Sequence, residues 1–262
     1  MLLNSSRRPK IKIYGERHTG TKYLYLLIVL NLRAQLIPGG EDLTKWYFKN
    51  AKEGSWRFEM TSDLYFKTHF SKTLGWKHIL LPAAEPFTQA GITPGDILFL
   101  TLTKNPYSWL LSLYQNPWHA FQKYASFDEF LKTPWKTRRR ENAPKEFATP
   151  MEMWNKKNSA YLRLKNSQWN TINLTYEGLV ADPEKWVNQI SQKIKTTKKS
   201  EIFINREATT TRFAPGKTYS DYKNYYLQER WKTRLNEQQI GLINQQLDED
   251  LMAEFGYTKI NI

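Results

Sequence analysis

The stretch KIKIYGERHTGTKYLYLLI, Lys10–Ile28, joins an apolar strand-like run to an apolar helix-like run through a short turn. Ile11 and Ile13 alternate with polar neighbours, which predicts a strand over Lys10–Tyr14. A helix is predicted from Thr21 to Gln35, where the sequence IPGG then ends it. Because a helix N-terminus presents unpaired backbone N–H groups and the positive end of the helix dipole, such a turn suits a phosphate or a sulfate.

The turn sequence GERHTGTKY departs from two common phosphate-binding patterns. It lacks the Gly-Lys-Ser/Thr ending of GxxxxGK[ST], and it does not match GxGxxG. Taken alone, the turn is equally compatible with a structural role in which glycine supplies a sharp backbone geometry. The turn by itself therefore leaves both interpretations open.

A second strand, loop and helix follow in GDILFLTLTKNPYSWLLSLYQ. Asp96–Thr103 is nearly continuously apolar, which is typical of a strand buried in a parallel sheet. Asn105 is predicted to cap a helix whose first position is Pro106. Strands that alternate with helices predict a three-layer α/β/α fold whose parallel sheet binds ligands beyond the carboxyl ends of its strands. No linker rich in Pro, Gly or Ser divides the chain, so we predict a single domain over residues 1–262.

The rest of the chain is assigned more coarsely. WRFEM and LYFKTHF, within residues 41–74, are compatible with short strands, GWKHILLP with a strand end, and IFINRE with a short strand. TPWKTRRRENAPK is interpreted as an exposed basic loop, and TTTRFAPGKTYSDY as another loop. The other predicted elements are the strand Thr171–Glu177 and the helices Met151–Asn166, Pro183–Ile194, Tyr219–Arg230 and Asn236–Phe255.

The composition limits which ligands and which catalytic groups are expected. The 39 Lys and Arg residues and 25 Asp and Glu residues give a net charge of +14, which favours anionic partners such as nucleotides, phosphates, acidic sugars or nucleic acid. There is no cysteine, and the 4 histidines do not form an HExxH motif, so we expect no disulfide, no thiolate nucleophile and no metal centre. The chain shows no signal peptide pattern and no apolar run of membrane-spanning length, so a cytoplasmic protein is expected.

Four motifs, taken together and in order, resemble those of the sulfotransferases that use 3′-phosphoadenosine 5′-phosphosulfate (PAPS). HTGTKY resembles the family's 5′-phosphosulfate loop, commonly KSGTTW, and KNPYSWLLS resembles its 3′-phosphate motif, an Arg and a Ser eight residues apart. WKHILLP resembles the KTHLP or KHGFP segment, and LTYEGLVADP the YEDL…DP segment. The C-terminal LNEQQIGLINQQLDEDLMAEFGY is similar to the ending of bacterial members. The resemblance implies a P-loop-like fold, PAPS as sulfuryl donor, its product 3′-phosphoadenosine 5′-phosphate (PAP), and no metal.

The resemblance also assigns donor-binding roles. The backbone of the opening turn would hold the 5′-phosphosulfate, with the Thr21 hydroxyl assisting, and Lys104 and Ser112 would bind the 3′-phosphate. Lys104 stands where the family has an arginine, which removes the bidentate guanidinium fork. The full set of donor-binding candidates is His18, Thr19, Gly20, Thr21, Lys22, Tyr23, Lys104, Ser112, Tyr176, Arg212 and Lys217, where Tyr23 and Tyr176 would contact the adenine. For the two tyrosines, burial in an ordinary aromatic core is the alternative.

Catalysis would need a base for the acceptor proton and a cation near the leaving group. His78 is the first candidate for the base because WKHILLP corresponds to the family's base-bearing segment; His69, in FKTHF, and Glu16 are alternatives. His18 occupies the position of the family's catalytic lysine, so the cation would be Arg17, ranked first, or Lys22.

Two other classes of protein share some of these features. A P-loop kinase or phosphotransferase has the same anion-holding turn, but it needs Mg²⁺ and carboxylate ligands for that ion. A non-catalytic nucleic-acid-binding protein would fit the charge and the aromatic content, although no recognised binding motif is present. The acceptor, a saccharide or another small molecule with a hydroxyl or an amine, would bind to variable loops over residues 41–74 and 115–150.

Overall fold

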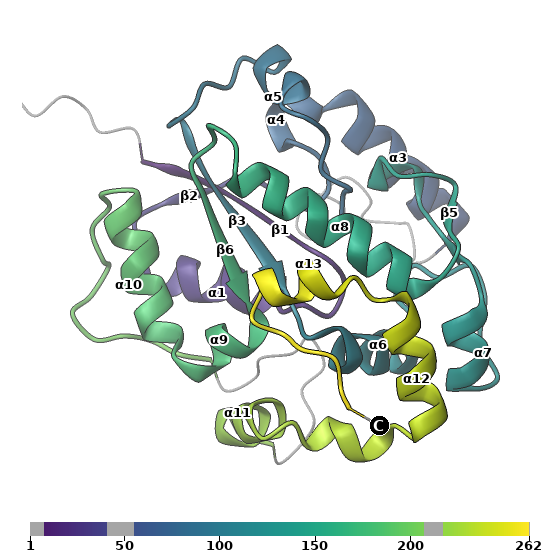
Figure 1. The fold of residues 1–262 in the computed structure, drawn as a ribbon. Helices are drawn as coiled ribbons and strands as arrows, with labels where there is room; N and C mark the ends of the chain where they lie inside the picture. The colour runs from purple at the N-terminus through teal and green to yellow at the C-terminus, as the bar shows by residue number, and fades with distance from the viewer. Residues whose placement is uncertain (1–7, 41–54, 207–216, 262) are drawn as a thin grey trace, which may run out of the picture.

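A four-stranded parallel sheet forms the centre of the protein (Figure 1). The structure is a computed structural model that describes residues 8–40, 55–206 and 217–261. The strand order is β2-β1-β3-β6, with β1 at Lys10–Gly15, β2 at Gln35–Leu36, β3 at Ile97–Thr103 and β6 at Thr171–Thr175. All three pairings are parallel, as the sequence predicts.

Helices cover both faces of the sheet, which confirms the predicted three-layer α/β/α arrangement (Figure 1). On one face, α1 packs with α9 and α10 in a core that includes Leu24, Leu179 and Ile190. On the other face, α5 and α8 contribute Phe87 and Tyr161 to a second core. The helix bounds are α1 Thr21–Asn31, α3 Trp56–Thr68, α4 Phe70–Thr73, α5 Glu85–Gln89, α6 Pro106–Gln115, α7 Phe127–Lys132, α8 Pro150–Lys165, α9 Tyr176–Ala181, α10 Pro183–Lys193, α11 Tyr219–Leu227, α12 Glu237–Gln246 and α13 Glu249–Glu254, with 3₁₀ helices η1 Arg139–Glu141 and η2 Arg230–Arg234.

The strand order places two loops side by side. The chain leaves β1 through α1 to reach β2 on one side, whereas β3 lies on the other side of β1. Gly15 and Leu102 pair near the carboxyl ends of β1 and β3, so the loops that follow these strands start from adjacent positions. This reversal of direction is where ligands bind in open α/β sheets.

The segment before β3 is helical, which corrects the prediction of short strands there. Trp56–Thr68 forms α3, capped by Ser55, whose side chain accepts from the N–H of Phe58. The buried positions of α3 follow a helical spacing, but two of them, Glu59 and Ser62, are polar. The apolar pattern was therefore incomplete in the sequence, because burial of these positions depends on partners from elsewhere in the chain.

Five further assignments differ from the structure. Residues 76–82 and 202–206 are not strands, and the helix that starts at Thr21 ends at Asn31 so that Gln35 lies in β2. The last predicted helix is two helices, α12 and α13, separated at Leu247 and Asp248, where Asp248 caps α13. The predicted basic loop contains η1 and strand β4, Trp135–Lys136, which pairs with β5, Glu146–Phe147. In the described part of the chain, no helix has the length and apolar character needed to cross a membrane.

Lys12, in the middle of β1, connects the sheet to the segment that carries His78. Its side chain is fully buried, and its ammonium donates to the carbonyl oxygens of Thr73 (2.5 Å), Gly75 (2.7 Å) and Pro38 (2.9 Å). Burial lowers the pKa of Lys12 well below its ordinary value, and the nearby charge of Lys77 lowers it further. The three carbonyl oxygens thus accept from a lysine side chain rather than from the backbone N–H groups of a neighbouring strand.

Replacing Lys12 by methionine is expected to lower the free energy of unfolding by about 1–3 kcal/mol, because buried carbonyl groups lose their donor. Lys10→Met is the matched control, since Lys10 is exposed at the start of the same strand. Urea denaturation followed by circular dichroism measures both variants. Equal stability of Lys12→Met and the wild type would show that these hydrogen bonds do not stabilise the fold.

Candidate functional site

Hydrogen bonds within the turn after β1 hold its shape, and they do not use the first backbone N–H groups of α1. The N–H and the hydroxyl of Thr19 both donate to the carbonyl of Glu16, at 3.2 and 2.6 Å, and His18 has a positive φ of 64°. Gly20 is the N-cap of α1 with φ 90°, and among the described residues no side chain caps the helix. The first N–H groups of α1 therefore remain available to an anion.

The two glycines of the turn are required by close contacts. A Cβ atom on Gly20 would lie 2.6 Å from a ring carbon of Tyr176, and one on Gly15 would lie 2.9 Å from the carbonyl oxygen of Leu102. Tyr176 follows β6, and Leu102 belongs to β3. The turn is thus fitted against the ends of two other strands.

Four buried charges hold the base of this turn. Arg17 pairs with Glu16 (2.6 Å) and with Glu141 of η1 (2.8 Å), and Lys157 of α8 pairs with Glu141 (2.7 Å) and with Glu16. All four side chains are at most 5% exposed. Burial lowers the pKa of Arg17, but Glu141 and Glu16 outweigh this effect and raise it above its ordinary value. The two cations and two anions neutralise one another.

This network decides the position of Glu16 and Arg17. Besides its ion pairs, the Arg17 guanidinium lies over the rings of Trp76 (5.0 Å) and Trp135 (5.6 Å). The Arg17 carbonyl accepts from the indole N–H of Trp109 (2.8 Å). The geometry therefore favours a role for Arg17 and Glu16 in holding the turn, and it does not favour the roles of cation and base that the sequence suggested for them.

His78 has the geometry of a general base. Its Nδ1 lies 2.5 Å from the carbonyl oxygen of Gly15, so we assign the ring proton to Nδ1, which leaves the lone pair on Nε2. Burial lowers the pKa of His78 well below its ordinary value, and Lys77 and Arg17 lower it further. The imidazole is therefore neutral, with its lone pair on Nε2. Lys157 also donates to the His78 carbonyl (2.6 Å), which connects this segment to the ion network.

Lys77 is a cation that the sequence analysis missed. Burial, followed by repulsion from Lys22 and Arg17, lowers the pKa of Lys77 to about 7. The Lys77 carbonyl accepts from the N–H of Gly15 (2.9 Å), which places the backbone of Lys77 beside the turn, whereas Lys22 is exposed on the first turn of α1. In the sequence, the sign that could have identified Lys77 was its position directly before His78 in WKHILLP.

Lys104 and Ser112 meet, as the 3′-phosphate interpretation requires. The Lys104 ammonium donates to Ser112 Oγ (2.9 Å), because α6 turns back beside the end of β3. The rings of Tyr176 (4.9 Å) and Tyr226 (4.2 Å) cover this ammonium, and the side chain is 1% exposed. Within the described ranges, no carboxylate forms an ion pair with Lys104. Glu177, the nearest candidate in sequence to Tyr176, instead accepts from the Tyr257 hydroxyl (2.6 Å).

The other candidate residues make different contacts. His69 stacks on Tyr65 (4.5 Å) at the end of α3. Tyr23 is buried in the core, and its hydroxyl donates to Asn205 (2.7 Å), which agrees with the alternative of a core tyrosine. His18 Nε2 lies 2.6 Å from the carbonyl oxygen of Asn116. Lys217 is exposed, and Arg212 lies outside the described residues.

The predicted basic loop is partly buried, which corrects the expectation of an exposed charge run. Arg140 is 5% exposed and pairs with Glu59 (2.6 Å) and Asp63 (2.9 Å) of α3. Its neighbour Glu141 belongs to the ion network described above. The loop thus connects α3 to the turn after β1, and a charge run in sequence gave no sign of these distant partners.

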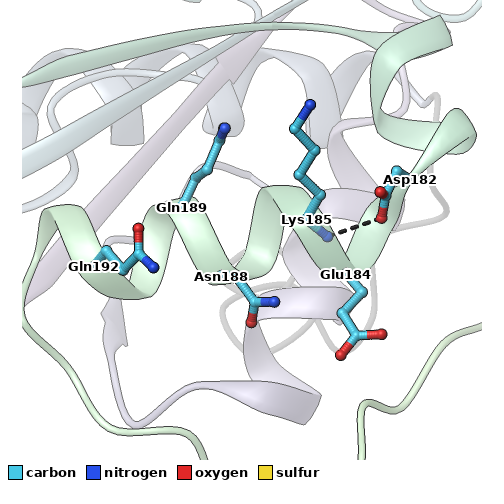
Figure 2. A pocket seen from close by; sticks show the side chains of 6 residues that line it. All are labelled: Asp182, Glu184, Lys185, Asn188, Gln189 and Gln192. Carbon is cyan, nitrogen blue, oxygen red and sulfur yellow. Dashed lines mark hydrogen bonds between the residues drawn. The ribbon is translucent and has the colours of Figure 1, made fainter.

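A surface groove lies along helix α10, which carries none of the candidate site residues. Figure 2 shows the side chains that line it along the helix, and the N–H of Lys185 donates to the Asp182 carboxylate (2.9 Å) at its start. None of the candidate donor-binding or catalytic residues lines this groove, which is formed by Asp182, Glu184, Lys185, Asn188, Gln189 and Gln192.

Comparisons with known proteins find similarity at the level of structure. No protein-family model and no curated protein sequence matches the chain. A sulfotransferase from Alicyclobacillus acidocaldarius is similar with a TM-score of 0.49 and 15% identity, over 95% of this chain and 96% of that one. The sulfotransferase domain of the Synechococcus PCC 7002 olefin synthase is similar with a TM-score of 0.42 and 13% identity, over 92% and 96%. At these identities, the similarity concerns the fold alone.

Lys157→Met is expected to lower the free energy of unfolding by about 3–5 kcal/mol, because two buried carboxylates would share a single cation, Arg17. Lys156→Met is the matched control, since Lys156 is exposed at the preceding position of α8. Denaturant titration of both variants measures the difference. A Lys157→Met protein as stable as Lys156→Met would contradict a structural role for the network.

The pKa of Lys77 predicts a pH dependence of stability. Because this pKa is about 7 in the folded protein and 10.5 in the unfolded chain, the unfolded state binds more protons between these values. The free energy of unfolding should therefore rise with pH across this window, and Lys77→Met should remove that part of the rise. Urea titrations at several pH values from 7 to 9.5 measure the slope, with exposed Lys67→Met as the control. Equal slopes for Lys77→Met and the wild type would exclude the proposed environment of Lys77.

Proposed function

We propose that the protein is a sulfotransferase that moves a sulfuryl group from PAPS to a hydroxyl or an amine of a saccharide or another small molecule. The main support for this proposal is that one aromatic ring contacts two groups that suit anions. Tyr176 contacts Gly20 at the open N-terminus of α1, and it also covers the Lys104 ammonium. A nucleotide with charged groups at both its 5′ and 3′ positions would use both of these features.

The residues fit the two ends of the donor in different ways. The N–H groups at the start of α1 suit the 5′-phosphosulfate through hydrogen bonds and the helix dipole. Lys104, which has no carboxylate partner within the described ranges, suits the 3′-phosphate together with Ser112. The Thr19 hydroxyl already donates to the Glu16 carbonyl, so we assign only its backbone to donor binding.

The proposed reaction is an in-line displacement at sulfur. The acceptor oxygen or nitrogen forms a bond to sulfur while the bond from sulfur to the bridging oxygen of the phosphate breaks. The bonding electron pair stays on that oxygen, which leaves as part of PAP. Nε2 of His78 takes the acceptor proton. Lys77, rather than Arg17, stabilises the charge that develops on the leaving group, since Arg17 is neutralised by Glu16 and Glu141.

Calorimetric titration with PAP, ADP and ATP plus Mg²⁺ tests this proposal. We expect metal-free PAP to bind most tightly, and Lys104→Ala to weaken PAP by about tenfold or more, because a charge-assisted hydrogen bond is lost. Exposed Lys136→Ala is the control. The affinity for ADP should change little in Lys104→Ala, since ADP has no 3′-phosphate.

Two outcomes would contradict the proposed function. A preference for ATP with Mg²⁺ would favour a kinase or phosphotransferase that uses the same turn. Failure to bind any of the three nucleotides, together with strongly salt-dependent binding to single-stranded DNA or RNA, would favour a nucleic-acid-binding protein.

A further inference from the structure

The Lys104 ammonium is enclosed in the protein. The side chain is 1% exposed, and Ser112 Oγ is the oxygen that accepts from it. Ser112 Oγ in turn donates to the Ser108 carbonyl (2.8 Å) inside α6. The ring faces of Tyr176 and Tyr226 also contact the ammonium. Burial raises the pKa of Glu177, and the charge of Lys104 partly offsets this rise. Water therefore has almost no access to a group that we assign to the 3′-phosphate.

A phosphate oxygen bonds to an ammonium at about 2.8 Å, which requires direct contact. An ammonium that water cannot reach has no space for a phosphate group, which is larger than water. One of the groups around Lys104 must therefore move before the donor's 3′-phosphate can bind. Among the residues that the structure describes in contact with the ammonium, the candidates are Ser112, Tyr176 and Tyr226.

Two of these groups are fixed by their surroundings. Ser112 lies inside α6 and is held by its hydrogen bond to Ser108. Tyr176 is 2% exposed and packs so closely on Gly20 that a Cβ atom there would lie 2.6 Å from its ring. Moving Tyr176 would therefore also disturb the turn that holds the 5′ end of the donor.

Of the two rings, that of Tyr226 is the more exposed, although it also packs against two of the hydrophobic cores. Tyr226 lies in the last turn of α11, a helix in which Tyr222 is the one buried residue among Tyr219–Leu227. Its ring is partly exposed and contacts the edges of Tyr176 (4.7 Å) and Tyr225 (5.0 Å). A rotation about its χ1 angle uncovers Lys104 and leaves α11 in place, where Lys223 bonds to the Ala181 carbonyl (2.7 Å).

We propose that the Tyr226 ring is a displaceable cover that occupies the 3′-phosphate subsite of the free protein and leaves it when the donor binds. This inference rests on the proposed function. The ring face stabilises the buried ammonium through a cation–π contact until a phosphate replaces it with charge-assisted hydrogen bonds. Tyr226 thus competes with the 3′-phosphate and lowers the affinity for every 3′-phosphorylated nucleotide, while it has no effect on nucleotides that lack this group.

Calorimetry with PAP and with AMP tests the cover. Tyr226→Ala is expected to bind PAP between about twofold and about thirtyfold more tightly than the wild type, which corresponds to the free energy of one cation–π contact. Its affinity for AMP should stay the same. Tyr226→Phe keeps the ring over Lys104 and should return the PAP affinity to the wild-type value. Leu227→Ala truncates the next side chain of α11 and is the control for disturbance of the helix.

The double variant Lys104→Met, Tyr226→Ala separates the cover from other effects. Without the ammonium there is no contact for the ring to make, so Tyr226→Ala should no longer tighten PAP binding in this background. Weaker or unchanged binding of PAP by Tyr226→Ala, in a wild type that prefers PAP to AMP, would overturn the cover alone. Equal affinities of the wild type for PAP and AMP would instead overturn the 3′-phosphate subsite of the proposed function.

Discussion

The candidate site depends on the ion network of Glu16, Arg17, Glu141 and Lys157. Removing charged groups from water costs several kcal/mol each, and this cost is offset only when opposite charges meet at hydrogen-bonding distance. The network meets that condition with two cations and two anions at the base of the turn. Because the four residues come from three separate parts of the chain, the turn has its shape only when β1, η1 and α8 are assembled.

The same network positions the candidate base. Lys157 donates to the carbonyl of His78, and Nδ1 of His78 contacts the carbonyl of Gly15, directly before Glu16. Lys12 and Tyr14 add bonds from β1 to the segment before Trp76, including one from the Tyr14 hydroxyl to the Leu74 carbonyl (2.7 Å). His78 and the turn after β1 are therefore parts of one hydrogen-bonded unit, which fixes their relative position.

The buried cations of this basic protein differ in whether they form ion pairs with carboxylates. Arg17, Arg140 and Lys157 are buried against carboxylates, so their charge is used inside the fold. Lys104 is buried as well, but aromatic rings and a hydroxyl surround it. Aromatic faces stabilise an ammonium without cancelling its charge, which leaves that charge for an anionic ligand. Net charge alone gives no means of separating these two groups of cations.

The sequence by itself determined the β1–turn–α1 and β3–loop–α6 units, because alternation, continuous apolar runs and caps are local patterns. The resemblance to sulfotransferases then pointed to Lys104, Ser112 and His78. It assigned no residue to the position of the family's lysine, where His18 stands, and the contacts of Arg17 do not favour Arg17 as the replacement cation.

Only the tertiary structure decided which charges are neutralised and which side chains cover the site. Glu141 and Lys157 lie more than a hundred residues from Arg17 and Glu16, so no local pattern connects them. Helix α3 escaped detection because its buried positions include Glu59, which is buried against Arg140, Arg138 and His119. In each case the deciding energy is the interaction between distant side chains removed from water, and it exists only once the chain has folded.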